Sequence, residues 1–521
     1  MIKKIAFFIG MIIIFALCFS IVSVIADPVN PEESTTASPD SSLTTGPTDT
    51  ALPSQGTAEH SPSPETIKPS KTPMLESPSS TPTIKPSTAP PVIVPDFLEA
   101  DMFAPLVSEI EAKGDIYNSN MEKNLNGYVI RIAASWNEKN DKNLNMEAIA
   151  AFEKKYNCKV AFLDLTREVL LDRLLISCST GITYFDAILT DSANILVNFE
   201  PLGLLDEFSK YMTAEELAKV PMSYQKILAS NNKLYGIQAH APDFMGVWSN
   251  RTLIDTHSLI NPYAEYSAGN WNWKTLVSVM EEAIGDKNGD GEVDVWGVAT
   301  AMNIYTPIVE SFGGSVFRWT GTEFVSGLSK NVTVGGIGFV RDVYLERYFS
   351  YDYESYFYLN QSTLLLGKSS MYSDLKRYLG RNELMFLPYP TFSGKDNIAT
   401  AAYADCVAIV KNSRYPAHTA ELLKTLYLDD FEKRIETFCV DNEFTKQTLT
   451  IYKSMLNNFT VDYTDAFDMK KELENQILSL IKNETAEFET SIMNINVLID
   501  NFIARRNKQI DLKNIPVQIK W

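Results

Sequence analysis

Short apolar runs and longer amphipathic stretches alternate along most of the chain. The apolar runs at 128–133, 159–163 and 185–189 have the length of β-strands. Between them, over 146–155 and 167–178, apolar residues recur at helical spacing, which predicts amphipathic helices packed on a sheet. An order of strand, helix, strand, helix, strand indicates parallel pairing with right-handed crossovers. The predicted fold class is therefore α/β.

The chain opens with the pattern of an export signal. Lys3 and Lys4 precede a long uncharged apolar run, which is the order that export requires. Residues 1–26 are therefore predicted to be a signal peptide or an N-terminal membrane anchor, with the rest of the chain outside the cytoplasm. Cleavage after Ala26, retention as an anchor and lipidation at Cys18 all remain open. We expect an exported protein, tethered or secreted, at the outer face of the cytoplasmic membrane or the cell surface.

Composition and charge narrow the class of protein further. Residues 27–97 are dominated by Ser, Thr and Pro, which predicts a disordered linker between the export segment and the folded part. The chain has 521 residues, of which 45% are hydrophobic, and is long enough to bury more than one core. Its net charge of -19 repels phosphate backbones, so nucleic acid is not expected as a partner.

The remaining cysteines and the absence of catalytic motifs carry less information. Cys158, Cys178, Cys406 and Cys439 are too sparse for a disulfide scaffold and are predicted to be buried free thiols, although their pairing stays open. The sequence contains no GxSxG, HExxH or P-loop motif, so no enzymatic activity is predicted. An exported carbohydrate-active enzyme remains the less favoured alternative, because sequence spacing cannot reveal a pair of glycosidase carboxylates.

An ordered series of short motifs extends from residue 127 to the C-terminus. The motifs are FEKKY at 152–156, FDAI at 185–188, LGLLD at 202–206, KLYGI at 233–237, NWNWK at 270–274, DKNGDGEVDVWG at 286–297, FGG at 312–314 and LGKSSM at 366–371. Their order and spacing resemble extracellular solute-binding protein family 1. This is the maltodextrin-binding-protein-like group that serves carbohydrate ABC importers.

The resemblance implies a two-lobed periplasmic-binding-protein-like (type II) fold, with a discontinuous pair of α/β lobes and a ligand cleft between them. Within a solute-binding domain at 98–521, the first lobe would comprise about 126–241 and 405–445, and the second about 242–404 and 446–521. The chain would cross between the lobes after Gly236 and again near 400–405.

The resemblance also implies a function. The protein would be the extracytoplasmic substrate-binding protein of an ABC importer, a monomer without a cofactor. It would capture a sugar or oligosaccharide by lobe closure and deliver this small-molecule solute to the permease membrane subunits. A sensor that presents its closed form to a membrane receptor would have the same fold, and this alternative remains open.

Candidate ligand-binding residues follow from the ends of the predicted strands, because ligands of open parallel sheets collect there. A sugar also needs aromatic planes and polar partners. Trp136 and Asp191 follow such strand ends. The resemblance implies that the cleft is also lined near the first crossover by His240, Asp243, Phe244 and Trp248, and at the second crossover by Tyr403 and Asp405. Trp136 is the preferred stacking residue. Asp191 is either a ligand acceptor or an N-cap for the following segment, and Trp248 is either a ligand contact or a core or hinge residue. Structural roles remain the alternative for His240, Asp243 and Phe244.

One acidic loop has the spacing of a Ca²⁺ site. Its oxygen ligands would be Asp286, Asn288, Asp290 and Asp294, with a glycine at the sharp turn. The last position of the loop is Gly297, where an EF-hand has a bidentate glutamate. A structural calcium ion and an acidic Asx-turn connection are therefore both open.

Overall fold

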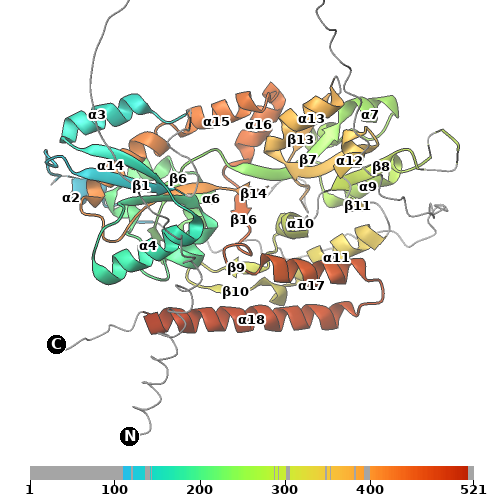
Figure 1. Cartoon of the computed structure of the whole chain (residues 1–521). Coiled ribbons are helices and arrows are strands. Elements are labelled where there is room, and N and C mark those ends of the chain that lie inside the picture. The colour runs from blue at the N-terminus through green and yellow to red at the C-terminus, as the bar shows by residue number, and fades with distance from the viewer. Residues whose placement is uncertain are drawn as a thin grey trace, which may run out of the picture. The chain divides into compact units, whose positions relative to one another are not determined.

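The protein is described from a computed structural model, shown in Figure 1. The structure describes residues 110–118, 121–134, 141, 143–286, 288–290, 293–300, 305–345, 349–351, 354–380, 383–391 and 399–513. The predicted export segment, the predicted linker and Trp136 lie outside these residues. Within the part of the chain that is described, no helix combines the length and the apolar character needed to cross a membrane.

The first lobe is built around a five-stranded sheet. Its strand order is β2 (Lys159–Asp164), β1 (Val129–Ala134), β3 (Ala187–Asp191), β15 (Asp405–Ile409) and β6 (Ile237–Gln238). Strand β1 pairs in parallel with both β2 and β3, whereas β15 runs antiparallel to β3. The parallel part confirms the predicted α/β class.

Local capping explains where the crossover helices of this lobe begin and end. Helix α3 (Met146–Tyr156) begins at Asn145, whose side chain accepts a hydrogen bond from the backbone of the first turn. Helix α4 (Arg167–Thr180) begins in the same way at Thr166. It ends at Gly181, whose φ of 73° is the left-handed conformation that glycine adopts without strain.

The second lobe is built around a larger, mixed sheet. Its strand order is β11 (Phe349–Tyr351), β8 (Trp296–Thr300), β12 (Ser362–Lys368), β7 (Asp243–Asn250), β14 (Ala399–Tyr403) and β16 (Phe459–Val461), and β13 (Leu384–Leu387) also pairs with β7. Strands β8, β11 and β12 are mutually parallel, and β7 runs antiparallel to β12, β13 and β14.

The remaining helices and strands complete each lobe. Those preceding β7 are α2 (Gly114–Asn118), α5 (Ala214–Ala218), α6 (Met222–Ile227), β4 (Ala229–Ser230) and β5 (Lys233–Leu234). Those following it are α7 (Arg251–Thr256), α8 (Pro262–Ser267), α9 (Trp273–Ala283), α10 (Tyr305–Ser311), β9 (Phe317–Trp319), β10 (Phe324–Ser326), α11 (Asn331–Leu345), α12 (Glu354–Tyr358) and α13 (Tyr372–Leu379). After β15 come α14 (Pro416–Leu423), α15 (Phe431–Asp441), α16 (Lys446–Met455), α17 (Lys470–Lys482) and α18 (Phe488–Lys513).

The chain passes between the two sheets three times. The first passage is at 239–242, between β6 and β7, and the second is at Ala404, between β14 and β15. The third lies between α15 and β16, because β16 pairs with β14 of the second sheet. Figure 1 shows β14 and β16 between the two lobes, and the long helix α18 running beneath both.

The buried core consists of aromatic and aliphatic side chains. Three cysteines belong to this core and the fourth packs against it. Cys158, Cys406 and Cys439 are buried and Cys178 is half-buried, and all four are free thiols. Burial raises the pKa of Cys439 to about 12, so its thiol stays protonated and unreactive. The predicted free thiols are confirmed.

Candidate functional site

Three of the predicted ligand residues meet where the first lobe faces the connections. Asp191 ends β3, and Asp405 begins β15 directly opposite it in the antiparallel register. His240 lies in the first passage between the lobes, with its Nδ1 atom 3.1 Å from Asp405 Oδ2. The structure therefore brings Asp191, His240 and Asp405 together at one edge of the first sheet.

Further polar side chains extend this group towards α15. His240 Nε2 lies 3.6 Å from Asp141 Oδ2, and the Arg434 guanidinium donates to the same carboxylate at 2.8 Å. Burial alone would raise the pKa of Asp141, but hydrogen bonds from His240, from the Asn143 backbone and from Arg434 hold it well below its usual range. Asp141 therefore remains ionised and keeps His240 in place.

Asp191 behaves differently from Asp141. Its pKa is raised to about 7, first by burial and then by the neighbouring Asp405 carboxylate. A hydrogen bond from the Ala193 backbone lowers the pKa by a smaller amount. Asp191 Oδ1 accepts that bond from Ala193 N at 2.8 Å, which is the local capping role that the sequence left open. A carboxyl group that titrates near neutral pH can both accept and donate hydrogen bonds to a ligand.

The second lobe contributes two of the predicted residues to the region of the passages. The Asp243 carboxylate accepts hydrogen bonds from the hydroxyl groups of Ser369 and Ser370, at 2.8 and 2.7 Å, and so fixes the turn that follows β12. Tyr403 pairs with Asp243 in the sheet and is 55% exposed. Its ring lies 4.5 Å from the Lys368 ammonium group, measured to the ring centroid.

Phe244 and Trp248 lie in the core of the second lobe. Both side chains have no exposed surface. The Phe244 ring packs on Tyr452 at 5.1 Å between centroids, and Trp248 Nε1 donates to the Lys368 carbonyl oxygen at 2.9 Å. Phe244 and Trp248 thus take the structural roles that the sequence left open for them.

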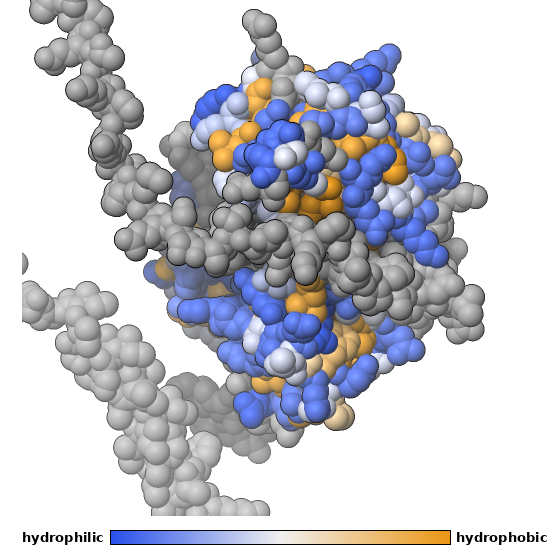
Figure 2. Space-filling view, turned by 90° about the vertical axis from the view of Figure 1, so that its right-hand side faces the viewer, coloured by the Kyte–Doolittle hydropathy of each residue, from blue (hydrophilic) through white to orange (hydrophobic). Residues whose placement is uncertain are grey.

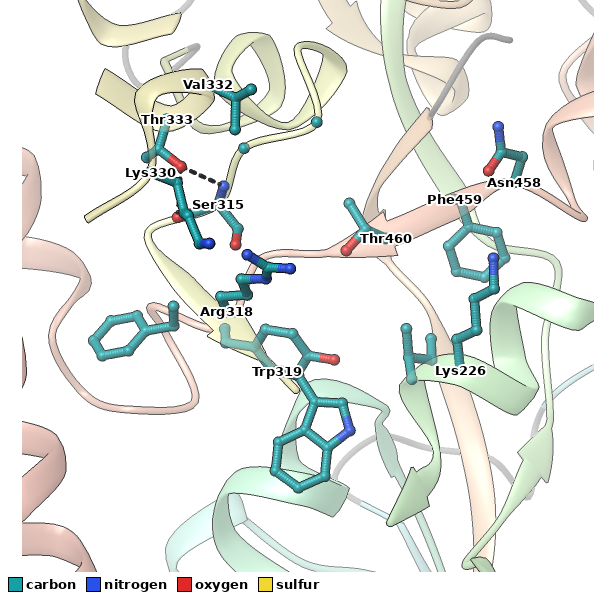
Figure 3. Close-up of a pocket in the computed structure, with 15 residues that line it drawn as sticks. Lys226, Ser315, Arg318, Trp319, Lys330, Val332, Thr333, Asn458, Phe459 and Thr460 are labelled. Atoms are coloured by element: carbon teal, nitrogen blue, oxygen red, sulfur yellow. Dashed lines mark hydrogen bonds between the residues drawn. The ribbon is translucent and has the colours of Figure 1, made fainter. Parts of the chain in front are cut away.

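A separate pocket lies between the lobes beside β16, with a cavity volume of about 70 Å³ (Figure 3). It is lined by Lys226, Ile227, Gly313, Gly314, Ser315, Phe317, Arg318, Trp319, Lys330, Val332, Thr333, Asn458, Phe459, Thr460 and Tyr463. The lobes touch beside it, because Trp319 Nε1 donates to the Ala229 carbonyl oxygen at 3.2 Å. Apart from Trp136, which lies outside the described residues, none of the predicted ligand residues lines this pocket.

Tyr463 links the pocket to the group around Asp191. It lines the pocket, and its pKa is raised by burial and then by the carboxylates of Glu310 and Asp191. The pocket and the edge of the first sheet are therefore electrostatic neighbours, and together they form the candidate site.

Comparisons with known proteins agree on the fold. No protein-family model and no curated protein matches the sequence. Among solved structures, the sugar-binding protein MalE from Xanthomonas citri is 12% identical, with 74% of this chain and 99% of that chain covered and a TM-score of 0.56. The chain has the two-lobed periplasmic-binding-protein-like fold.

Two further structures share this fold. A cyclo/maltodextrin-binding protein complexed with maltotetraose is 12% identical, covers 76% of this chain over 100% of its own length and has a TM-score of 0.55. The extracellular solute-binding protein from Staphylococcus aureus in complex with maltose is 11% identical, covers 73% of this chain over 98% of its own length and has a TM-score of 0.54. The fold that the sequence motifs implied is thus confirmed.

Several residues of the candidate site were missed by sequence reasoning. Arg434 and Asp141 come together from segments almost three hundred positions apart, and neither belongs to a recognisable motif. Lys226 and Arg318 line one pocket from α6 and β9. Only Trp319 left a local signal, as an aromatic residue ahead of the Thr-Gly-Thr turn of the β9–β10 hairpin.

The predicted calcium loop makes its own internal hydrogen bonds. Asp286 Oδ1 accepts from the backbone N–H groups of Asn288 and Asp290, and the Asn288 amide donates to Asp290 and to Asp294 at 3.0 and 2.9 Å. These are the contacts of an Asx-turn connection. Among the residues that the structure describes, no group of three or more His, Cys, Asp or Glu side chains is arranged to hold a metal ion. Calcium at this loop stays a prediction.

Proposed function

We propose that this protein is the extracytoplasmic substrate-binding protein of an ABC importer, and that it captures a carbohydrate between its lobes without altering it. The observation that carries the proposal is the pair of α/β lobes joined by three passages, with polar side chains gathered where the lobes meet. Hinged lobes of this kind can close around a guest, because a few residues in the passages absorb the rotation.

The chemistry of the site supports a saccharide. The carboxylates of Asp191 and Asp405 can accept hydrogen bonds from sugar hydroxyl groups, while Tyr403 offers an exposed aromatic surface next to the second passage. The neighbours of the same fold that were solved with maltotetraose and with maltose favour the same class of ligand.

Capture without hydrolysis is favoured by where the carboxylates lie. A glycosidase holds its two carboxyl groups on either side of the scissile bond. Here Asp191 and Asp405 extend from paired strands of one lobe, so they do not lie on opposite walls of a cleft. The basic and apolar N-terminal segment supports a location outside the cytoplasm.

A glycan-library thermal-shift screen tests the capture step. We expect at least one saccharide to raise the melting temperature, because a ligand that binds only the folded state stabilises it by mass action. The same saccharide, recovered after incubation, should show no new reducing ends. A shift caused by peptides alone would contradict the carbohydrate assignment, and new reducing ends would contradict the non-catalytic role.

Delivery to a permease needs its own experiment. The ATPase of the cognate importer, reconstituted in liposomes, should be stimulated by the sugar-loaded protein and by neither the protein nor the sugar alone. Unchanged ATPase activity together with activation of a membrane receptor would assign the protein to sensing.

A further inference from the structure

The pocket beside β16 differs in charge from the rest of the molecule. The chain carries 65 acidic and 46 basic residues and a net charge of -19. Among the described residues that line the pocket, however, Lys226, Arg318 and Lys330 are basic and none is acidic. A basic lining of this kind in a strongly acidic protein favours a negatively charged ligand group.

The three basic side chains are partly withdrawn from water. All are half-buried. Lys226, on α6, has no hydrogen-bond or ion-pair partner among the residues that the structure describes. A cation that is partly desolvated and unpartnered costs free energy, which a bound anion would recover.

The cations approach the pocket from different elements. Figure 3 shows Arg318 and Lys330 on one side of Thr460 and Lys226 on the other. The first turn of α11, with Val332 and Thr333, also lines the pocket, so the positive end of a 15-residue helix adds to the charge of the side chains. The hydroxyl groups of Thr333 and Thr460 are further hydrogen-bonding groups in the lining.

We propose that this pocket binds a small oxyanion, a carboxylate or sulfate group carried by an acidic saccharide. A cavity of about 70 Å³ holds several atoms of the size of water, each of which needs roughly 10–15 Å³, and so has room for a small oxyanion. The charged substituent enters the pocket, while the rest of the saccharide extends along the junction of the lobes. This inference rests on the proposed function and names the class of its ligand.

Binding of the oxyanion couples to the spacing of the lobes. Lys226 belongs to the first lobe, whereas Arg318 and Lys330 belong to the second. An anion held between these residues is attracted from both sides of the junction. The acidic saccharide therefore favours the approach of the two lobes.

Calorimetry on the full chain tests the proposal. The probes are sulfate, glucuronate, a tri-galacturonate and the neutral trisaccharide of the same linkage, each at an ionic strength matched with sodium chloride. We expect tri-galacturonate to bind at least about tenfold more tightly than the neutral trisaccharide, as one charge-assisted contact supplies. Lys226→Met should remove most of that difference and Lys226→Arg should restore it. Lys433→Met, at an exposed lysine on α15, is the matched control and should change nothing.

The possible outcomes distinguish a free anion from an acidic saccharide, and they distinguish failure of this inference from failure of the proposed function. Binding of sulfate with equal affinity for the two trisaccharides would mean that the pocket takes a free anion, and would overturn the acidic saccharide as its carrier. Tight binding of neutral sugars with no effect of Lys226→Met would overturn the inference and leave the proposed function standing. If no saccharide binds, the proposed function fails with it.

Discussion

Glu310 is fully buried on α10, and its carboxyl group accepts a hydrogen bond from the Thr400 hydroxyl of β14. Burial raises its pKa well above the usual value, and the carboxylate of Asp462 adds to that shift. The folded protein therefore binds a proton at Glu310 more tightly than the unfolded chain does. Stability falls as pH rises from the ordinary pKa of a glutamate towards the raised one, because folding then keeps a proton that the unfolded chain releases.

Glu310→Gln removes this cost. Glutamine keeps a carbonyl oxygen that can accept from Thr400, but it cannot ionise. We expect the variant to melt a few degrees higher than the wild type at neutral pH, about 2 °C or more, and with little difference near pH 4. Differential scanning calorimetry between these values is the measurement. A wild-type advantage at neutral pH would show that the ionised carboxylate is needed by the fold.

The carboxyl group of Asp191 should make ligand binding depend on pH. Its pKa is raised to about 7, so the acceptor form of the side chain predominates only above neutrality. For a saccharide whose hydroxyl donates to Asp191, affinity should rise with pH below that value, by up to about tenfold per pH unit. Asp191→Asn should give a flat profile in the same titration. A wild-type profile as flat as that of the variant would place Asp191 outside the ligand contacts.

At the scale of elements, the β9–β10 hairpin depends on one glycine. Gly327 begins the turn that follows β10, and a Cβ atom there would lie 1.6 Å from the Ser315 carbonyl oxygen. Ser315 precedes β9 and lines the pocket between the lobes. Close approach of these two backbone segments is what holds the hairpin against the start of α11.

Gly327→Ala should therefore displace backbone, since the clash is with a carbonyl group and not with the end of a flexible side chain. We expect a loss of about 2 kcal/mol or more of unfolding free energy, measured by urea denaturation. Gly338→Ala in the middle of α11 is the matched control. Its Cβ would meet only the Phe488 ring at 3.5 Å, and the change should stabilise the helix by up to about 1 kcal/mol. Equal effects of the two substitutions would contradict the close approach at Gly327.

Elements were predictable where the signal is local. The strands and helices of 128–189 follow from apolar spacing, which the structure reproduces, and in the structure Thr166 and Gly181 cap helix α4. The pocket was not predictable from the sequence. Lys226 and Arg318 belong to no motif, and only the folded chain places α6 and β9 beside the same pocket. For Trp248 the residue type misled the prediction. A tryptophan suits a sugar site, but Trp248 lies on β7, which pairs with β12 within the sheet, and its side chain is buried in the core.

At the scale of the whole molecule, one face of the surface mixes hydrophobic and hydrophilic residues. Figure 2 shows one face on which hydrophobic residues gather only in patches among hydrophilic ones. The contacts that matter for function are instead those that cross between the lobes. The C-terminal helix α18 makes one of them, because it lies along the second lobe and its end reaches the first.

Helix α18 is anchored on the second lobe through Asn496, which accepts a hydrogen bond from Ser326 at 2.6 Å. Near its end, the Arg506 guanidinium donates to the Val197 carbonyl oxygen and to the Asn198 side chain of the first lobe. Burial lowers the pKa of Arg506, as expected for a cation enclosed by such a contact. Asn198 in turn donates to the Ala466 carbonyl oxygen at 3.0 Å. The tie between the lobes therefore consists of the hydrogen bonds of Arg506 and Asn198, and it includes the segment after β16.

Arg506→Ala should therefore loosen the two lobes without unfolding either of them. The tie exists only while the lobes are close, so its loss shifts the unliganded protein towards a wider spacing, measured as the distance between spin labels on α3 and α13. Ligand affinity should fall by the same factor as the closed population, because ligand binding must then supply the missing closure energy. Arg505→Ala, at the exposed neighbouring position, is the control and should leave both quantities unchanged. A variant at Arg506 with wild-type spacing but weaker binding would mean that the arginine acts on the ligand and not on the hinge.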